Sequence, residues 1–189
     1  MRHGGGGGIM RQVVLDTETT GFSPQAGHRI VELACVEVVG GVVTGRHFHR
    51  HFNPDRAVDP KAQEVHGLTA DFLADKPRFA EVVDELVAFI GGAEIIAHNA
   101  PFDVRFLDHE LTLAGRPTVD GLCVGVVDTV KLAREKHPGV RNDLSALCDR
   151  YQVDASGRAE HHGALVDALC LADVYLRMAG PQSAALAEG

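Results

Sequence analysis

Three stretches of apolar and β-branched residues near the start of the chain predict a meander of strands. The first covers residues 13–15 and runs directly into an acidic segment. The second and third, residues 30–39 and 42–52, are separated by Gly40-Gly41, a dipeptide typical of a two-residue hairpin turn. The opening of the chain is therefore predicted to fold as three sequential strands.

The rest of the chain alternates between amphipathic helices and short apolar strands. Residues 79–90 place apolar side chains at helical spacing, and Gly91-Gly92 ends this pattern. Asn99 and Asn142 are interpreted as helix N-caps, and Asp128 as the cap of the helix that it precedes. The remaining pattern predicts strands at 94–98 and 123–127, and helices at 99–114, 129–136, 142–151 and 163–179.

With 189 residues, of which 45% are hydrophobic, the chain can form one sizeable core, and a single domain is expected at residues 9–180. Residues 1–8 are interpreted as a disordered Gly-rich leader or a cloning remnant, and residues 181–189 as a short tail. No apolar run approaches a membrane span, and four scattered cysteines suit a reducing, cytoplasmic location. A net charge of −8 argues against non-specific binding of nucleic acid through a basic surface.

Acidic side chains stand near several predicted strand ends and helix starts. Asp16 and Glu18 are two positions apart on one strand, so they are expected on the same face, where each raises the pKa of the other unless cations intervene. Asp103 falls in the first turn of a predicted helix, just after a strand. Taken singly, the pair reads as solvated acids, and Asp103 as a carboxylate that complements the helix dipole.

Histidines follow two informative patterns. His162 precedes Asp167 by five positions, and such residues on a continuous helix lie about 140° apart. The two can meet only if His162 lies in the loop ahead of the helix, where Gly163 favours a break; the alternative is a surface histidine and a surface aspartate. His47, His49 and His51 alternate along one predicted strand. We interpret them as a solvated strand face rather than as a set of metal ligands.

Taken together, these motifs resemble the DEDD exonuclease superfamily, in its His-containing branch. Residues 16–21, residues 98–103 and the pair His162 and Asp167 match the motifs of that superfamily in the same order. Within the branch, the chain is similar to the epsilon-type proofreading subunits of bacterial replicases over about residues 12–180. The likeness also covers segments outside the motifs, at 27–30, 58–60, 65–67, 141–142 and 147–148.

The resemblance implies both a fold and a chemistry. The family fold is a ribonuclease H-like α/β mixed sheet, antiparallel in its first three strands and parallel afterwards, flanked by helices. Family members release nucleoside 5′-monophosphates one at a time from a 3′ end with two Mg²⁺ or Mn²⁺ ions. By motif match, His162 is the general base, and the metals are held by Asp16, which bridges both ions, Glu18, Asp103 and Asp167. The terminal nucleotide is held by the residues matching Thr19, Val65, His66, Asn99 and Phe102.

The leading hypothesis is a DNA proofreading exonuclease that binds a single-stranded or frayed DNA 3′ end and partners the polymerase (alpha) subunit of a replicase. Residues 182–186 stand where such subunits carry a sliding-clamp motif, but Ala185 and a missing aromatic remove its apolar anchors, so clamp binding is not expected. A stand-alone enzyme on RNA or short oligonucleotides, like ribonuclease T or oligoribonuclease, shares the same motifs. The alternative of another class is a catalytically silent module that binds a polymerase or a nucleic-acid end.

Overall fold

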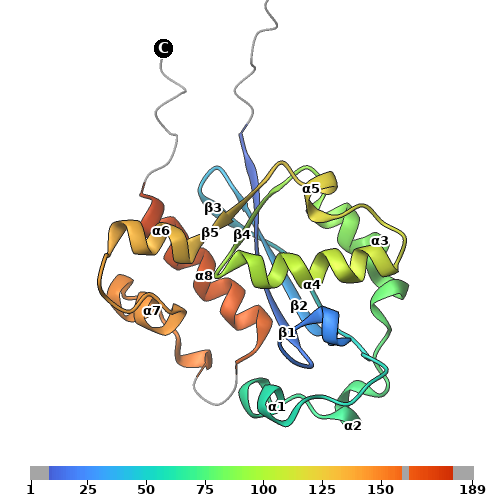
Figure 1. Ribbon diagram of the computed structural model, residues 1–189. Helices are drawn as coiled ribbons and strands as arrows, with labels where there is room; N and C mark the ends of the chain where they lie inside the picture. Colours follow the sequence, from blue (N-terminus) through green and yellow to red (C-terminus); the bar gives the residue numbers. More distant parts are fainter. Residues whose placement is uncertain (1–8, 159–161, 181–189) are drawn as a thin grey trace, which may run out of the picture.

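The computed structural model describes residues 9–158 and 162–180; the leader predicted at 1–8 and the tail at 181–189, with its clamp-motif position, lie outside them. One sheet is built from β1 (Arg11–Thr19), β2 (Ile30–Val39), β3 (Val42–His51), β4 (Glu94–Ala97) and β5 (Gly125–Asp128). Its strand order is β3-β2-β1-β4-β5, with antiparallel pairing among the first three strands and parallel pairing of β1 with β4 and of β4 with β5 (Figure 1). The predicted mixed α/β sheet is confirmed.

Helices cover both faces of the sheet (Figure 1). One face carries α3 (Phe79–Ile90), α4 (Ala100–Leu113) and α5 (Val119–Leu122), and the other carries α6 (Thr129–Lys136), α7 (Leu144–Tyr151) and α8 (Ala164–Ala179). Alternation along β1 divides its side chains between two cores: Val13 and Leu15 join α3 and α4, whereas Val14 joins α8. Asp16 and Glu18 continue the Val14 side and therefore point toward α8.

Short helices occupy the connections between the longer elements. They are η1 (Pro24–Ala26), α1 (Pro60–His66), α2 (Ala70–Leu73) and η2 (Ser156–Arg158). The Asp59 side chain caps α1, and its N–H donates to the carbonyl of Thr20 at 2.9 Å, which ties α1 to the end of β1. Within the described part of the chain, no helix is long and apolar enough to cross a membrane.

An ion pair with a buried carboxylate holds α4 against the start of β2. Arg29 donates through Nε and Nη2 to the two carboxylate oxygens of Glu110, at 2.8 and 2.7 Å, and the Ile30 N–H donates to the same carboxylate at 3.2 Å. Glu110 is 1% exposed, so its charge is stabilised almost entirely by these donors. The pair fixes the helix that carries Asp103.

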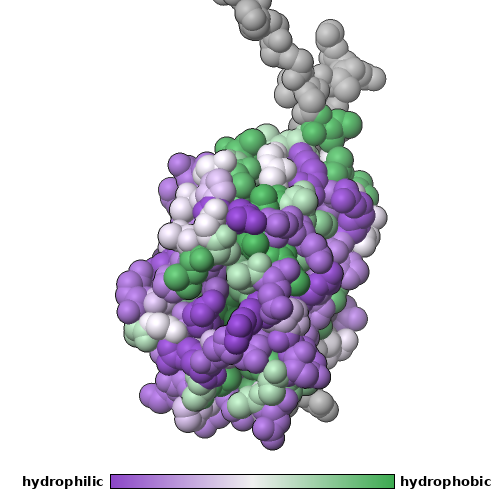
Figure 2. Space-filling model, turned by 90° about the vertical axis from the view of Figure 1, so that its right-hand side faces the viewer, coloured by the Kyte–Doolittle hydropathy of each residue, from purple (hydrophilic) through white to green (hydrophobic). Residues whose placement is uncertain are grey.

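The outer surface of α3 follows its predicted amphipathic pattern. Its apolar side chains face the core, and its charged residues, such as Asp84 and Glu85, are exposed. Figure 2 shows the right-hand side of Figure 1, where hydrophilic side chains cover most of the surface and apolar ones emerge in small patches.

Two predicted helix caps differ from the structure in detail. The helix predicted at 142–151 begins later, because Asp143, and not Asn142, accepts the capping hydrogen bond from the Ala146 N–H at 3.0 Å. Asn99 stands at the N-cap position of α4 as predicted, but it has a left-handed φ of 68° and makes no side-chain capping bond.

The strand predicted at 123–127 also shifts. It runs from Gly125 to Asp128, because the preceding residues form the unpredicted helix α5. Asp128 is confirmed as the cap of α6, since its side chain accepts a hydrogen bond from the Val130 N–H at 3.0 Å.

The interpretation of the β3 histidines as a solvated face is right for His47 and wrong for the other two. His47 is exposed. His49 and His51 are only 27% and 24% exposed, because both rings turn toward the buried carboxylate of Glu32 on β2. Glu32 belongs to the neighbouring strand β2, so the sequence of β3 alone could not reveal it as their partner.

Candidate active site

Acidic residues from separate segments meet where parallel strands end. Asp16 and Glu18 lie near the end of β1, and Asp103 lies in the first turn of α4, which follows β4. Because β1 and β4 run parallel, these ends share one edge of the sheet. Asp167, in the first turn of α8, joins the group, and single carboxylate oxygens of Asp16, Glu18 and Asp167 lie within 4.8 Å of one another.

Asp103 lies beside this trio. It is 4% exposed, and its carboxylate accepts a hydrogen bond from the Thr17 hydroxyl at 2.7 Å. After burial itself, the charge of Asp103 is the largest cause of the raised pKa of Asp16, which places the two carboxyls close together. The structure thus brings all four predicted acids into one neighbourhood.

These crowded carboxyls resist ionisation. Burial and then repulsion from Asp103 and Glu18 raise the pKa of Asp16 well above its ordinary value. Burial and then repulsion from Glu32 raise the pKa of Glu18 to about 9, and burial raises the pKa of Asp103 to about 7. A cation placed among them would favour the ionised forms, so the site is built to gain from bound positive charge.

Arg158 is the member of the site that the sequence analysis missed. Its side chain is 8% exposed, and its Nε donates to Oδ1 of Asp167 at 2.6 Å. Its Nη1 donates to the hydroxyl of Ser145 at 2.8 Å. No periodicity marks Arg158, which ends η2, and its position four residues before His162 was the one available indication. In the absence of metal, this guanidinium balances the charge of Asp167.

His162 lies in the loop ahead of α8, in the arrangement that its spacing from Asp167 requires. Its Nδ1 is 3.4 Å from Oδ2 of Asp167, and 46% of the side chain is exposed. The backbone N–H of His162 donates to the carbonyl of Val65 at 3.2 Å, so the loop is attached to the end of α1. Gly163 takes the N-cap position of α8. An accessible imidazole beside the acids is able to exchange a proton with water.

The corner at the end of α1 presents an apolar side chain next to His162. Val65 is 50% exposed, whereas His66 is 5% exposed. The His66 Nδ1 accepts a hydrogen bond from the Leu68 N–H at 3.0 Å, so its Nε2 carries the proton and donates to the carbonyl of Thr19 at 3.1 Å. His66 and Thr19, which is 6% exposed, therefore fix the corner from which Val65 projects.

Asn99 and Phe102 lie at the same end of the sheet as the acids. Asn99 joins β4 to α4, and its N–H donates to the carboxylate of Asp128 at 3.1 Å. The ring of Phe102 packs against Phe106 with centroids 5.0 Å apart, and the Arg105 guanidinium lies 5.9 Å from its centre. Phe102 directly precedes Asp103, so both residues are positioned by the first turn of α4.

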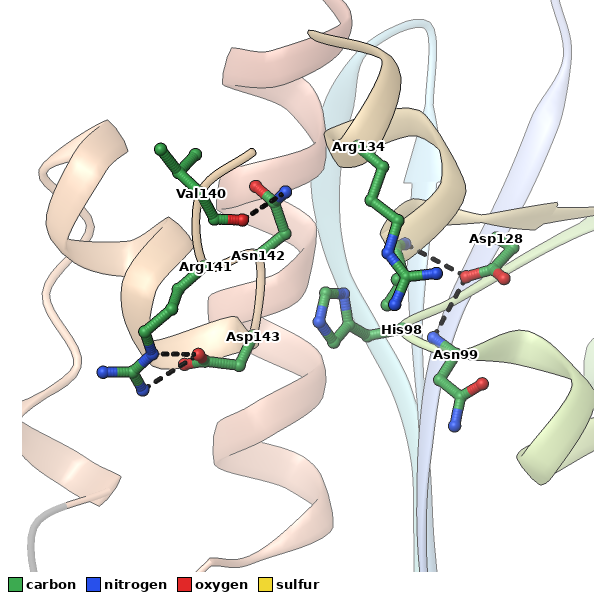
Figure 3. Close-up of a pocket in the computed structure, with 9 residues that line it drawn as sticks. His98, Asn99, Asp128, Arg134, Val140, Arg141, Asn142 and Asp143 are labelled. Atoms are coloured by element: carbon green, nitrogen blue, oxygen red, sulfur yellow. Dashed lines mark hydrogen bonds and ion pairs between the residues drawn. The ribbon is translucent and has the colours of Figure 1, made fainter. Parts of the chain in front are cut away.

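A pocket of about 600 Å³ opens at the carboxyl ends of β4 and β5 (Figure 3). It is lined by His98 and Asn99, by Arg134 on α6 and by the loop at 140–143. Figure 3 shows the side chains of His98 and Arg134 pointing into it. Burial lowers the pKa of His98, although the negative charge of Asp128 opposes the shift. Asn99 lines the pocket and also stands at the N-cap of α4, whose first turn carries Asp103, so the pocket adjoins the acids.

The donor set of the site fits hard divalent cations. The four acids offer carboxylate oxygens, without a thiolate or an imidazole among the converging trio. Burial first, and then repulsion from the neighbouring acids, raise the pKa values of Asp16 and Glu18, and for Glu18 the charge of Arg158 opposes the shift without cancelling it. Bound divalent metal ions would supply the missing positive charge.

Most of the chain is similar to known exonucleases. A family model described as an exonuclease matches residues 13–175. The chain is 47% identical over 172 residues to DNA polymerase III subunit epsilon of Rickettsia prowazekii, covering 90% of this chain and 75% of that protein. It is 50% identical over 181 residues to DNA polymerase III subunit epsilon of Escherichia coli K12, covering 93% and 74%. Among solved structures, exonuclease X in complex with 5′ overhanging duplex DNA has a TM-score of 0.69 at 29% identity, covering 88% and 90%.

Family, fold and site agree with one another. The matched region contains all four acids and His162, and the mixed sheet brings them together. Exonucleases of this family work with divalent metal ions, for which the acids of this chain provide oxygen ligands. The chain therefore belongs to the exonuclease family, and it is a 3′–5′ exonuclease similar to the epsilon subunits of bacterial DNA polymerase III.

Proposed function

We propose that this exonuclease removes nucleotides one at a time from DNA 3′ ends and proofreads for a replicative polymerase. The observation that carries the proposal is the convergence of acids from β1, α4 and α8 beside an exposed histidine. We assign Asp16, Glu18, Asp103 and Asp167 as metal ligands and His162 as the general base. The products are nucleoside 5′-monophosphates.

The acids are assigned two Mg²⁺ or Mn²⁺ ions, because these metals prefer all-oxygen ligand sets. When bound, the ions supply fixed positive charge for the negative charge that develops at the phosphodiester, and they lower the pKa of a bound water. Asp16 is assigned as the ligand shared by both ions. After burial, which is the largest cause, the charges of Asp103, Glu18 and Asp167 each raise its pKa, as expected for the acid at the centre of the group.

His162 is assigned to accept the proton of the attacking water. Its Nδ1 lies 3.4 Å from Oδ2 of Asp167 and 3.3 Å from Nη2 of Arg158, and we assign the other nitrogen, Nε2, as the one that takes the proton when Nδ1–H donates to Asp167. Asp167 then has two tasks, since its second carboxylate oxygen orients the imidazole while the carboxylate holds metal. The exposure of the ring gives the proton a route to solvent.

The terminal nucleotide is assigned to the residues at the rim of the acids. The 3′-terminal base has to leave its partner before cleavage, and this costs less at a mismatch, which gives proofreading its selectivity. The exposed Val65 beside His162 and the ring of Phe102 provide apolar contacts for that base. Asn99 provides a polar side chain, while Thr19 and His66 hold the corner in position.

The pocket next to the acids is assigned to the strand that leads to the 3′ end. A chain with a net charge of −8 needs local positive charge wherever it meets phosphates. Arg134 points into the pocket and provides such a charge (Figure 3). The pocket therefore suits a short single strand rather than an intact duplex, whose recognition needs a wider basic surface.

DNA and a polymerase subunit are assigned as substrate and partner from the relatives. Two of them are named subunits of DNA polymerase III, and the solved exonuclease X structure contains duplex DNA. We accordingly propose a frayed DNA 3′ end as the substrate and the polymerase (alpha) subunit of a replicase as the partner. Binding to a sliding clamp is not part of the proposal.

A primer carrying a terminal mismatch tests these assignments. The protein is incubated with primers labelled at either end, with Mg²⁺, with Mn²⁺ and with chelator, alongside RNA of the same sequence. We expect labelled mononucleotide from the 3′-labelled primer, a shortening ladder from the 5′-labelled one, faster removal of mismatched ends, and no product with chelator. The Asp167→Asn variant serves as the matched control. Faster cleavage of RNA than of DNA would refute the proofreading assignment, and activity in chelator would refute the metal assignment.

A further inference from the structure

A second cluster of metal-ligating side chains lies on the same face of the sheet as the acids. Glu32 on β2 stands directly opposite His51 on β3, and His49 lies two positions further along β3. His49 Nε2 is 2.7 Å and His51 Nε2 is 3.4 Å from the same oxygen of Glu32. One ligand atom from each of the three side chains falls within 4.8 Å of the others.

We propose that Glu32, His49 and His51 form a site for a zinc-class transition-metal ion, distinct from the catalytic metals. Two imidazole nitrogens and one carboxylate oxygen are a donor set that Zn²⁺, Co²⁺ or Ni²⁺ binds well and that Mg²⁺ does not favour. Three protein ligands leave at least one coordination position for water. This proposal goes beyond the exonuclease activity and does not depend on it.

The ligands are held in place before any ion arrives. The Glu32 side chain is 6% exposed, and it also accepts a hydrogen bond from the backbone N–H of Ala164 at the start of α8. Burial alone would raise the pKa of Glu32, but the hydrogen bonds from His49 and His51 lower it to about 2, so the carboxylate is ionised in neutral solution. An ionised, oriented carboxylate is ready to act as a metal ligand.

The two imidazole rings are also held in fixed orientations by their neighbours. Their rings meet edge to face with centroids 5.0 Å apart, and the His51 ring meets the Phe72 ring edge to face at 5.1 Å. The side chains are 27% and 24% exposed, so an ion has a path from solvent. Zinc–ligand bonds of about 2.0–2.2 Å place neighbouring donor atoms roughly 3.4 Å apart, so closure on an ion requires shifts of about 1 Å.

The cluster adjoins the catalytic acids without sharing a ligand with them. Glu32 pairs with Glu18 across β1 and β2, and Glu32 is the neighbouring charge that contributes most to the raised pKa of Glu18. Because Zn²⁺ also binds carboxylates, a binding experiment has to separate this site from the Asp16, Glu18 and Asp167 trio.

The experiment titrates the chelator-treated protein with Zn²⁺ against a chromophoric competitor, in excess Mg²⁺, and records the visible spectrum with Co²⁺. We expect one high-affinity Zn²⁺ per chain and a Co²⁺ spectrum typical of nitrogen ligation. His49→Gln and His51→Gln should each weaken Zn²⁺ binding at least about tenfold, since each removes one of three ligands. His47→Gln, on the exposed histidine of the same strand, and Asp167→Asn should leave that affinity unchanged.

The result is decisive in either direction. Absence of stoichiometric Zn²⁺ binding at micromolar protein would overturn the proposal, and so would a loss that follows Asp167→Asn instead of the β3 variants. Equal loss in His47→Gln and His51→Gln would also overturn it. Far-UV circular dichroism checks that each variant is folded, and Glu32→Gln, which keeps the shape of the side chain, provides an independent test of the third ligand.

Discussion

Replacing Glu18 by Gln should change how the metal-free protein responds to pH. The Glu18 carboxyl has its pKa raised from 4.5 to about 9, first by burial and then by repulsion from Glu32. A group whose pKa is higher in the folded state stabilises the fold fully below its unfolded pKa, and that stabilisation is lost as pH rises toward the folded pKa. Metal-free protein should therefore lose stability between about pH 5 and about pH 9.

The size of the effect follows from the width of that window. Between about pH 6 and about pH 8, Glu18 is protonated in the folded protein and ionised in the unfolded chain, so folding retains close to one extra proton. Each pH unit then costs about 1.4 kcal/mol, or about 3 kcal/mol over the interval. For a chain of this length, that corresponds to a fall in Tm of about 5–10 °C from this residue.

Thermal unfolding followed by circular dichroism at the two pH values, in chelator, measures this fall. Glu18→Gln mimics the protonated side chain and cannot titrate. The Tm of the variant should therefore fall less between the two pH values, by most of the amount attributed to Glu18. Glu135→Gln, on an exposed position of α6, should behave like the wild type. With excess Mg²⁺, the wild type should recover stability at the higher pH and the variant much less. An identical pH response of Glu18→Gln and wild type in chelator would refute the reasoning, because it would mean that Glu18 is already ionised.

Three further changes separate metal binding, proton transfer and folding. Asp167→Asn keeps a partner for Arg158 but weakens a metal ligand, so hydrolysis should fall at least about 100-fold while circular dichroism shows a folded chain. His162→Ala should lower the rate at saturating Mg²⁺ about 10²–10⁴-fold, with Mg²⁺ affinity by calorimetry unchanged; loss of that affinity would contradict its role as base. Glu110→Ala leaves the partly exposed Arg29 guanidinium and the buried Ile30 N–H without their carboxylate partner, so urea unfolding should show a loss of about 1–3 kcal/mol, and a loss below about 0.5 kcal/mol would contradict the stabilising role of the pair.

Local pattern was enough to predict most of the fold, whereas the meeting of the four acids was implied by the family resemblance and not by any single element. Strand alternation placed Asp16 and Glu18 on one face, and the structure puts both toward α8. Helical spacing predicted α3 with its observed ends, residues 79–90. The five-residue gap between His162 and Asp167 required a break ahead of α8, and the helix does begin at Ala164. Each of these conclusions depends on geometry within one element or at one of its ends.

Contacts between elements were beyond this kind of reasoning. The Arg158 side chain reaches Asp167 from a short helix with no periodicity of its own, so no pattern pointed to it. Glu32 approaches His49 and His51 through the register of β2 with β3, which a single strand does not reveal. The cap at Asp143 instead of Asn142 reflects a choice between adjacent residues with similar capping ability.

The charge balance of the site links its metal-free form to its chemistry. Without metal, burial and then mutual repulsion raise the pKa values of Asp16 and Glu18 and so favour their protonated forms, and the Arg158 guanidinium pairs with Asp167. A divalent ion that binds these acids has to release the protons and compete with the guanidinium for Asp167. Metal affinity should consequently rise with pH. The same acids that are costly to ionise without metal would therefore favour the binding of a hard divalent cation.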